Sequence, residues 1–252
     1  PSLGVHHLTH DITPYNTFEA SYRLFQTVEY WPKGTTFVSV VDPGAGSSRK
    51  SVVALTKTGQ YIVTPDNGTL SYIKKDVGIV AVREISEVEN RCSNTELSYT
   101  FHGRDVYAYT GAKLASGHIS FEEVGPELPV DKILEFPVVE TIIEENLVRG
   151  AIDILDVRFG SLWTSITRDD FYALEPNFGD RFEVTIFNND MLVYQNQVTY
   201  GKSFADVRIG QPIIYINSLY RVGLAINQGS FAKAYNVGLG SNWHIEIKRL
   251  GD

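Results

Sequence analysis

Apolar residues recur at helical spacing near the start of the chain and then give way to a strand-like run. Between residues 18 and 31 they recur at intervals of three or four, as at Ala20, Leu24 and Val28, which predicts a helix ended by the turn that follows. The β-branched run at residues 36–41 lies between Gly and Pro and is typical of a strand buried on both faces of a parallel sheet. Helix and buried strand in succession indicate an α/β unit.

The remaining elements of the first half fit this reading, whereas the second half is different. We expect strands at 51–56, 60–64 and 79–82 and a helix at 105–116. After the break at residues 125–129, short strands follow one another with turns between them, which predicts an all-β barrel or sandwich. The strands are expected at 146–155, 181–187, 192–200, 212–216, 221–226 and 243–248. We therefore assign residues 1–130 to an α/β domain with a mostly parallel sheet and flanking helices, and residues 138–252 to a β domain.

Composition excludes several classes of function. The 252 residues carry a formal charge of −8, which disfavours a nucleic-acid partner and suits a small cationic ligand. A single cysteine, Cys92, cannot form an internal disulfide, and no apolar run approaches the ~20 residues of a membrane span. No leader precedes the first motif, so we expect a cytoplasmic protein with no membrane partner.

Two short segments carry groups that suit the activation of water. Asp42 follows the run at 36–41, at the strand end where α/β sheets bind ligands, and Arg49 lies seven residues on. His102 precedes a predicted helix and is followed by Gly103, which leaves space beside it. A carboxylate, a permanent cation and an imidazole can together hold and activate a water molecule. The alternatives are a structural turn at Asp42 and a structural histidine.

Other motifs are weaker. Residues 44–48 are Gly-rich but match neither a phosphate-binding P-loop nor a dinucleotide fingerprint, and the histidines lack metal-ligand spacing, so we expect no metal site. Asp66-Asn67-Gly68 is first of all a turn. Residues 156–164 and 217–230 place polar groups beside aromatic ones, which indicates a small-molecule pocket or an ordinary barrel rim.

Several motifs in order resemble one known family, the S-adenosylmethionine hydrolases (adenosine-forming), relatives of the S-adenosylmethionine-dependent fluorinases and chlorinases. The matching segments are residues 9–14, 40–46, 65–68, 100–105, 156–160, 217–218 and 225–230. The resemblance implies an N-terminal α/β domain, a C-terminal β-barrel, and a homotrimer whose sites lie between the N-terminal domain of one subunit and the C-terminal domain of the next. It also implies S-adenosylmethionine as substrate, with no cofactor.

The resemblance implies roles for particular residues. The Asp-Arg-His triad of the hydrolases falls on Asp42, Arg49 and His102, and halogenating members lack it. The residues expected to contact substrate are Tyr15 near the ribose, Phe101 and Gly103 along the wall, Asp156 at the methionine amino group, Ser218 at its carboxylate, and Phe159, Ser161, Asn227 and Gln228 around adenine. Ser161 stands where the family has asparagine, so we expect weaker recognition of adenine.

The family also begins with a strand ending in Asp-Phe-Gly, and Pro1 aligns after it, so this first strand is apparently absent. The expected reaction is hydrolysis of S-adenosylmethionine by water attacking C5′, giving adenosine and L-methionine, with Asp42 or His102 as the base. The alternatives are a halogenase of the same fold and a catalytically silent protein that binds S-adenosylmethionine or adenosine.

Overall fold

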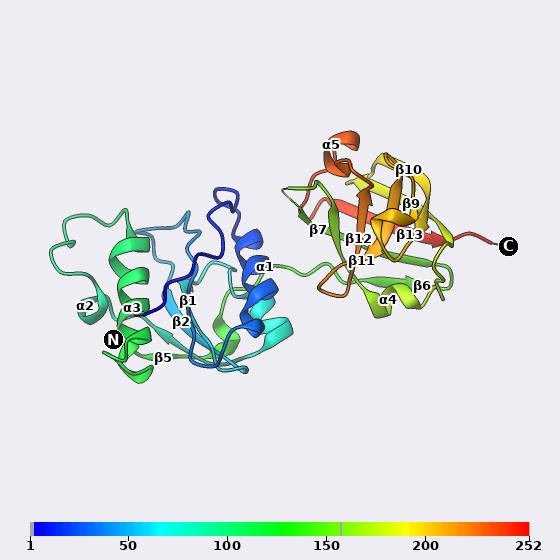
Figure 1. Ribbon diagram of the computed structural model, residues 1–252. Helices are drawn as coiled ribbons and strands as arrows, with labels where there is room; N and C mark the ends of the chain where they lie inside the picture. Colours follow the sequence, from blue (N-terminus) through cyan, green and yellow to red (C-terminus); the bar gives the residue numbers. More distant parts are fainter. Residues whose placement is uncertain (1–2, 157, 252) are drawn as a thin grey trace. The chain divides into compact units, whose positions relative to one another are not determined.

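The computed structural model describes residues 3–156 and 158–251 and contains two compact units, Pro1–Pro137 and Val138–Asp252 (Figure 1). We describe each unit by itself.

The first unit is a five-stranded sheet with helices on both faces. The helices are α1 (Thr17–Thr27), η1 (Val28–Tyr30), η2 (Ile73–Val77), α2 (Glu87–Asn90), η3 (Gly103–Ala108), α3 (Tyr109–Ala115), η4 (Glu122–Val124) and η5 (Val130–Lys132). The strands are β1 (Thr36–Val38), β2 (Ser51–Thr56), β3 (Tyr61–Pro65), β4 (Ile79–Glu84) and β5 (Glu127–Leu128), in the spatial order β1-β3-β2-β4-β5. In this unit the predicted helices and strands are confirmed to within a few residues, except that the strand expected at 36–41 is shorter.

The expectation of a mostly parallel sheet is wrong, because the sheet is mixed. Among its described strands only β1 and β3 pair in parallel, and the β2–β3, β2–β4 and β4–β5 pairs are antiparallel. The cause is local. The turn at 57–59 joins β2 to β3 as a tight hairpin, and two strands joined by so short a turn must run antiparallel.

Strand β1 is also shorter and more exposed than its sequence predicts. It ends at Val38, and only Phe37 is buried, whereas Val38 is 44% exposed. In the described part of the sheet β1 lies at the edge and pairs with β3 alone, so its other edge has no strand beside it. The chain then continues irregularly toward Asp42.

Alternation along the central strands builds two cores. Val52, Ala54 and Ile62 pack toward α1, with Leu24 and Val28, whereas Val53 and Val63 pack toward the other face with Val106 and Leu114. Side chains of a strand alternate between faces, so the two helical layers lie on opposite sides of the sheet, as α1 and α3 do in Figure 1. Tyr107, at the α3 side, is fully buried in the second core.

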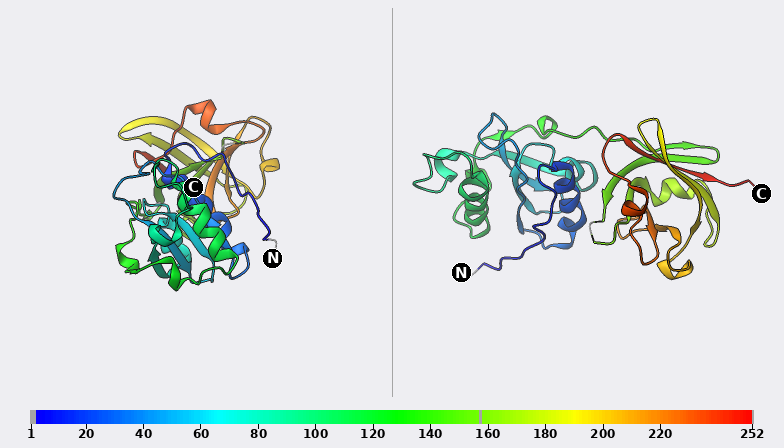
Figure 2. Two further views of the ribbon diagram at one scale, coloured as in Figure 1. Left: turned by 90° about the vertical axis from the view of Figure 1, so that its left-hand side faces the viewer. Right: turned by 90° about the horizontal axis from the view of Figure 1, so that it is seen from above.

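The second unit is a closed β-barrel, so the expected C-terminal barrel is confirmed. Its strands are β6 (Ile142–Glu144), β7 (Leu147–Leu155), β8 (Leu162–Thr167), β9 (Arg181–Asn188), β10 (Met191–Tyr200), β11 (Pro212–Ile216), β12 (Arg221–Ile226) and β13 (Trp243–Arg249). They follow the order β13-β9-β10-β11-β12-β8-β7-β6, and an additional β13–β7 pairing closes seven of them into a ring. The closed curve is visible in the right-hand view of Figure 2.

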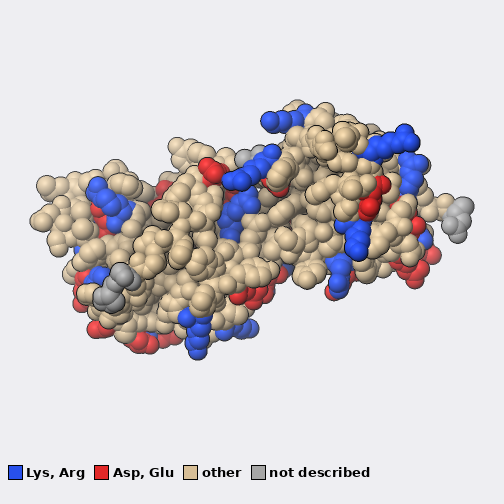
Figure 3. Space-filling model, in the orientation of Figure 1, with Lys and Arg blue, Asp and Glu red and all other residues tan. Residues whose placement is uncertain are grey.

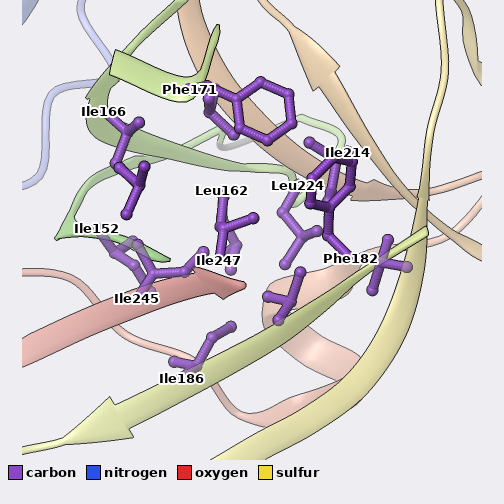
Figure 4. Close-up of a cluster of buried hydrophobic side chains, with 14 of the residues drawn as sticks. Ile152, Leu162, Ile166, Phe171, Phe182, Ile186, Ile214, Leu224, Ile245 and Ile247 are labelled. Carbon is purple, nitrogen blue, oxygen red and sulfur yellow. The ribbon is translucent and has the colours of Figure 1, made fainter. Parts of the chain in front are cut away.

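Alternate residues of these strands fill the barrel. Leu162, Leu224 and Ile245 are fully buried and point inward together (Figure 4). Their neighbours Trp163 and Gly223 therefore face outward. Strand β8 was not expected, because its sequence Leu-Trp-Thr-Ser-Ile-Thr mixes polar with apolar residues. The short helices α4 (Arg168–Tyr172), η6 (Phe204–Asp206) and α5 (Phe231–Tyr235) complete the unit.

Candidate functional site

Asp42 and Arg49 form a two-pronged ion pair in the loop that connects β1 to β2. Arg49 Nε donates to Asp42 Oδ1 at 2.7 Å, and Arg49 Nη2 donates to Asp42 Oδ2. Their side chains are only 6% and 10% exposed, respectively. Charge-assisted bonds of this bidentate kind fix the position of the carboxylate as well as its charge.

The same arginine connects this pair to the helical side of the sheet. Arg49 Nη1 donates to Ser51 Oγ at 2.8 Å, and Ser51 Oγ lies 3.1 Å from the Tyr107 hydroxyl. The guanidinium also lies over the Tyr107 ring, 5.4 Å from its centre. Burial raises the pKa of the Tyr107 hydroxyl well above its ordinary value, so the phenol keeps its proton and remains a hydrogen-bond donor.

His102 precedes the same helical segment that carries Tyr107. Gly103–Ala108 has the wider π-helical turn, which occurs often at functional sites, and His102 is the residue before it. The imidazole is 4% exposed, and its Nε2 lies 3.5 Å from Oε1 of Glu87 on α2. Within the described residues its Nδ1 is buried without a hydrogen-bond partner.

The structure therefore joins Asp42 and Arg49 directly, whereas His102 lies in a neighbouring segment of the same unit. In the part of the chain that is described, no hydrogen bond or ion pair links His102 to Asp42 or Arg49. The two segments nevertheless pack closely, since a Cβ added at Gly46 would lie 3.2 Å from the Tyr99 carbonyl and one at Gly103 would lie 3.3 Å from Val40 Cγ1. Because Gly46 and Gly103 have no side chain, the segment that carries Asp42 can pack closely against the segment that carries His102.

Two turns fix the loop that carries Asp42. The amides of Ala45 and Ser47 donate back to the carbonyls of Asp42 and Gly44, so they fold the loop rather than await a ligand. Asn67 Nδ2 donates to the Val41 carbonyl at 2.8 Å, directly before Asp42. The Asp66-Asn67-Gly68 segment is thus a turn, as predicted, and one that also positions the site.

Tyr15 is presented in an unusual conformation. It has φ of 68°, which a non-glycine residue rarely adopts, and its side chain is 79% exposed. The flanking Asn16 caps α1 by accepting from the Glu19 amide, and the buried Glu19 carboxylate accepts from the Thr13 amide at 3.1 Å. These two hydrogen bonds hold the backbone on either side of Tyr15, one of the residues expected to contact substrate.

Phe101 is also presented to solvent. It is 54% exposed beside half-buried Gly103, with the Arg104 guanidinium 4.8 Å from the centre of its ring. An exposed ring next to buried His102 is consistent with a wall residue of a binding site, which is the role expected from the sequence.

In the second unit, the β7–β8 connection carries three predicted substrate residues. Asp156 Oδ1 accepts from the amides of Arg158 and Phe159, and Phe159 is 70% exposed, whereas Ser161 is buried. Val157 lies outside the described residues. Gly160, with φ of 68°, packs so tightly against Ser230 that any side chain there would collide with it. The loop is therefore pinned against the start of α5.

Trp163, within the segment 156–164 named above, and Tyr215, which sequence reasoning missed, lie near Ser161. Trp163 Nε1 donates to the Tyr215 hydroxyl at 2.9 Å, across Gly223 of the strand between them. A Cβ at Gly223 would lie 2.6 Å from Tyr215 Cζ, so this glycine makes room for the ring. The outward alternation of β8, β11 and β12 was the available signal, but β8 was not predicted.

The predicted substrate residues of this unit divide between two ends of the barrel. Asn227 and Gln228 follow β12 and lie near the Asp156–Ser161 connection, because Leu162 pairs with Leu224 near that end. Ser218 precedes β12, near the opposite end of β8. Strand β12 has six residues, so about 17 Å separates its ends. A site that uses both groups of residues must extend along the outer wall.

The described residues contain no group of three or more His, Cys, Asp or Glu side chains that could hold a metal ion. No helix among them has the length and apolar character needed to cross a membrane. Lys and Arg lie among Asp and Glu on the face shown in Figure 3, without an extended basic surface on its described residues.

Comparisons with known proteins cover both units. The family model described as the S-adenosylmethionine (SAM) hydroxide adenosyltransferase N-terminal domain matches residues 1–125, and the corresponding C-terminal domain model matches residues 150–244.

Individual relatives are similar over nearly the whole chain. A Thermus thermophilus protein named (R)-S-adenosyl-L-methionine hydrolase is 30% identical over 240 residues, which cover 93% of this chain and 84% of that protein. A fluorinase of Actinopolyspora mzabensis is 27% identical over 94% of this chain and 85% of its own length. The crystal structure of an uncharacterized conserved protein from Thermotoga maritima matches with a TM-score of 0.89 and 32% identity, over 99% of this chain and 90% of that chain.

Proposed function

The chain belongs to the SAM hydroxide adenosyltransferase family, and we propose that this enzyme hydrolyses S-adenosyl-L-methionine to adenosine and L-methionine. The observation that carries the proposal is the pairing of Asp42 with Arg49 in the same unit as a buried histidine whose Nδ1 has no partner among the described residues. These groups suit the activation of water, whereas a halide needs no base.

The reaction demands a positioned oxygen nucleophile more than it demands acid catalysis. The sulfonium of the substrate is already a good leaving group, so the enzyme must hold a water molecule in line with the C5′–S bond. The water oxygen forms a bond to C5′, the C5′–S electron pair returns to sulfur, and the water loses one proton. The products are adenosine, methionine and that proton.

We assign the proton to His102. Both Asp42 oxygens already accept from Arg49, so Asp42 is suited to orienting the water through a remaining lone pair. His102 Nδ1 is buried and unpartnered in the described chain, which is what a base requires before it takes a proton. Arg49 keeps the neighbouring carboxylate charged and in place.

The substrate contacts follow the family resemblance. We propose that Asp156 and Ser218 hold the amino and carboxylate groups of methionine, and that Phe159, Ser161, Asn227 and Gln228 surround adenine. Tyr15, Phe101 and Gly103 would line the ribose and the reacting carbon. The exposed rings of Phe159 and Tyr15 support contact with a ligand. No cofactor is required by this scheme.

We further propose a homotrimer with its sites at subunit interfaces. The candidate catalytic residues lie in one compact unit and the candidate methionine and adenine contacts lie in the other. Each unit thus holds an incomplete site, which a partner subunit's complementary unit would complete.

A halogenase is the second candidate, favoured by the similarity to a fluorinase over 94% of this chain. In that reaction a chloride or fluoride ion replaces water, and the product is a 5′-halo-5′-deoxyadenosine. The two candidates differ in what attacks C5′, so product analysis separates them.

The deciding experiment incubates the protein with S-adenosylmethionine, alone and with added chloride or fluoride. We expect adenosine and methionine in every arm, and their loss in the Asp42→Asn and His102→Gln variants. A halogenated nucleoside would overturn hydrolysis in favour of the second candidate. Calorimetric binding without any product would instead identify a silent binding protein.

A further inference from the structure

Glu87 forms an ion-pair contact with the candidate base, and sequence reasoning did not single it out. Its Oε1 lies 3.5 Å from His102 Nε2, although the two residues are fifteen positions apart. Its other oxygen, Oε2, accepts from Arg91 Nη1 at 2.9 Å. The carboxylate thus lies between a fixed cation and the imidazole.

Arg91 is held by the segment that leads to His102. Its Nη2 donates to the carbonyl of Ser98 at 2.6 Å and to that of Thr95 at 3.2 Å, and its guanidinium lies 4.6 Å from the centre of the Tyr99 ring. Only 6% of the Arg91 side chain is exposed. The same cation therefore fixes both Glu87 and the approach to the histidine.

The short helix that carries Glu87 is also firmly anchored. Asn90, at its end, is fully buried, and its Nδ2 donates to the Val124 carbonyl at 2.9 Å while its Oδ1 accepts from Lys113. Thr110 of α3 donates to the Asn90 carbonyl. Because α2 is held in place by these bonds, the Glu87 carboxylate can impose an orientation on the neighbouring His102 ring.

We propose that Glu87 is a positioning residue for His102: its carboxylate, 3.5 Å from Nε2, accepts a hydrogen bond from the Nε2–H group, so the proton of the neutral ring stays on Nε2 and Nδ1 is the nitrogen that removes a proton from water. A neutral imidazole has one protonated and one unprotonated nitrogen, and the partner of one nitrogen decides the state of the other. The buried Nδ1, unpartnered in the described chain, is the nitrogen this arrangement leaves open.

The proton balance is simple, and it rests on the proposed hydrolysis. As the water oxygen bonds to C5′ and the C5′–S pair returns to sulfur, one water proton moves to Nδ1. The resulting imidazolium, protonated on both nitrogens, faces the Glu87 carboxylate, which stabilises it until the proton passes to solvent. Glu87 itself keeps its charge throughout.

The first readout is the tautomer of His102. In protein labelled with ¹⁵N-histidine, long-range ¹H–¹⁵N correlation distinguishes protonated from unprotonated ring nitrogens, and the His102→Gln spectrum identifies the signals among the six histidines. We expect the neutral ring of the unaltered protein to carry its proton on Nε2. A proton on Nδ1 would overturn the proposal without any variant of Glu87.

The second readout is kinetic. Glu87→Leu should lower kcat by about tenfold or more, with KM changed less than about twofold, and should release the ring to a mixture of tautomers. Glu87→Gln retains an acceptor oxygen and should recover part of both properties. Glu89→Gln, an exposed carboxylate of the same helix, is the matched control and should behave like the unaltered enzyme.

Failure of this inference can be told from failure of the proposed function. If adenosine is formed and Glu87→Leu keeps the kcat and the tautomer of the unaltered enzyme, Glu87 has no positioning role. If no adenosine is formed at all, hydrolysis is wrong, and the tautomer in the unaltered protein and in Glu87→Leu still decides whether Glu87 orients the ring.

Discussion

Arg49 binds both oxygens of Asp42, through Nε at 2.7 Å to Oδ1 and through Nη2 to Oδ2, with both side chains almost removed from solvent. The loop between β1 and β2 thus presents a carboxylate that cannot rotate. A carboxylate held in this way can orient a water molecule through the lone pairs that remain. The third nitrogen, Nη1, extends the arrangement to Ser51 and so to Tyr107.

Arg49→Lys should abolish this geometry while keeping the charge. A lysine offers a single ammonium group in place of a planar fork, so Asp42 would be free to rotate. We expect kcat for adenosine formation to fall by about tenfold to a hundredfold, with the fold intact by circular dichroism. The same change at exposed Arg208 is the control. An active Arg49→Lys enzyme would show that charge alone is sufficient.

Tyr107→Phe should lower stability more than activity. The Tyr107 phenol keeps its proton because burial raises its pKa, and it shares its hydrogen bond with Ser51, which also accepts from Arg49. Loss of a buried bond of this kind costs about 1 kcal/mol of unfolding free energy. Urea denaturation measures this, with Tyr109→Phe on the neighbouring helix as control. An unchanged midpoint would mean that the hydroxyl contributes nothing.

Mixed subunits test the proposed interface sites. Asp42→Asn and Asp156→Ala alter different compact units, and each variant alone should be inactive. If sites combine units of neighbouring subunits, unfolding and reassembling the two variants together should restore about a quarter of the unaltered activity, because that fraction of interfaces joins two unaltered units. Complete absence of activity in the mixture would indicate sites within one chain.

Asp66 should make stability depend on pH. Burial raises the pKa of its carboxyl above the ordinary value, and this outweighs the bond from the Leu134 amide. Between the unfolded and the folded pKa the folded state binds more protons, so the free energy of unfolding falls as pH rises through that window.

The variant Asp66→Asn still accepts from the Leu134 amide, at Oδ1, and does not titrate. Its unfolding free energy should therefore fall less between about pH 4 and pH 7 than that of the unaltered protein. Asp131→Asn, whose side chain is 76% exposed, should leave the pH dependence as it was. An identical slope in Asp66→Asn and the unaltered protein would rule out this carboxyl as the source.

Local pattern predicted most of the elements, and long-range relations explain what it missed. Helical spacing at Ala20 and Leu24 identified α1, and β-branched runs identified β2 and β9. The direction of the strands in the first sheet was wrong because the turn at 57–59 was not used as a constraint on pairing. Strand β8 was missed because its inward positions include the polar Thr164 and alternate with partly exposed residues, so it contains no continuous apolar run.

In the candidate site, too, local sequence pattern identified some residues, whereas others depend on long-range packing. Asp42, Arg49 and His102 stand next to strand or helix signals, so their sequence context pointed to them. Glu87 has no such context, since it lies in a four-residue helix and reaches His102 only through the packing of α2. The position of Asn227 and Gln228 near the Asp156–Ser161 connection likewise follows from the pairing of β12 with β8, which a single sequence does not display.

The source of the oxygen that reaches C5′ is the most direct test of the central claim. In water labelled with ¹⁸O, hydrolysis by the route proposed here places the label on the 5′ oxygen of adenosine and none on methionine, and the Asp42→Asn and His102→Gln variants form neither product above background. Adenosine without label, or label retained at an unchanged rate in both variants, would contradict an activated water held by these residues.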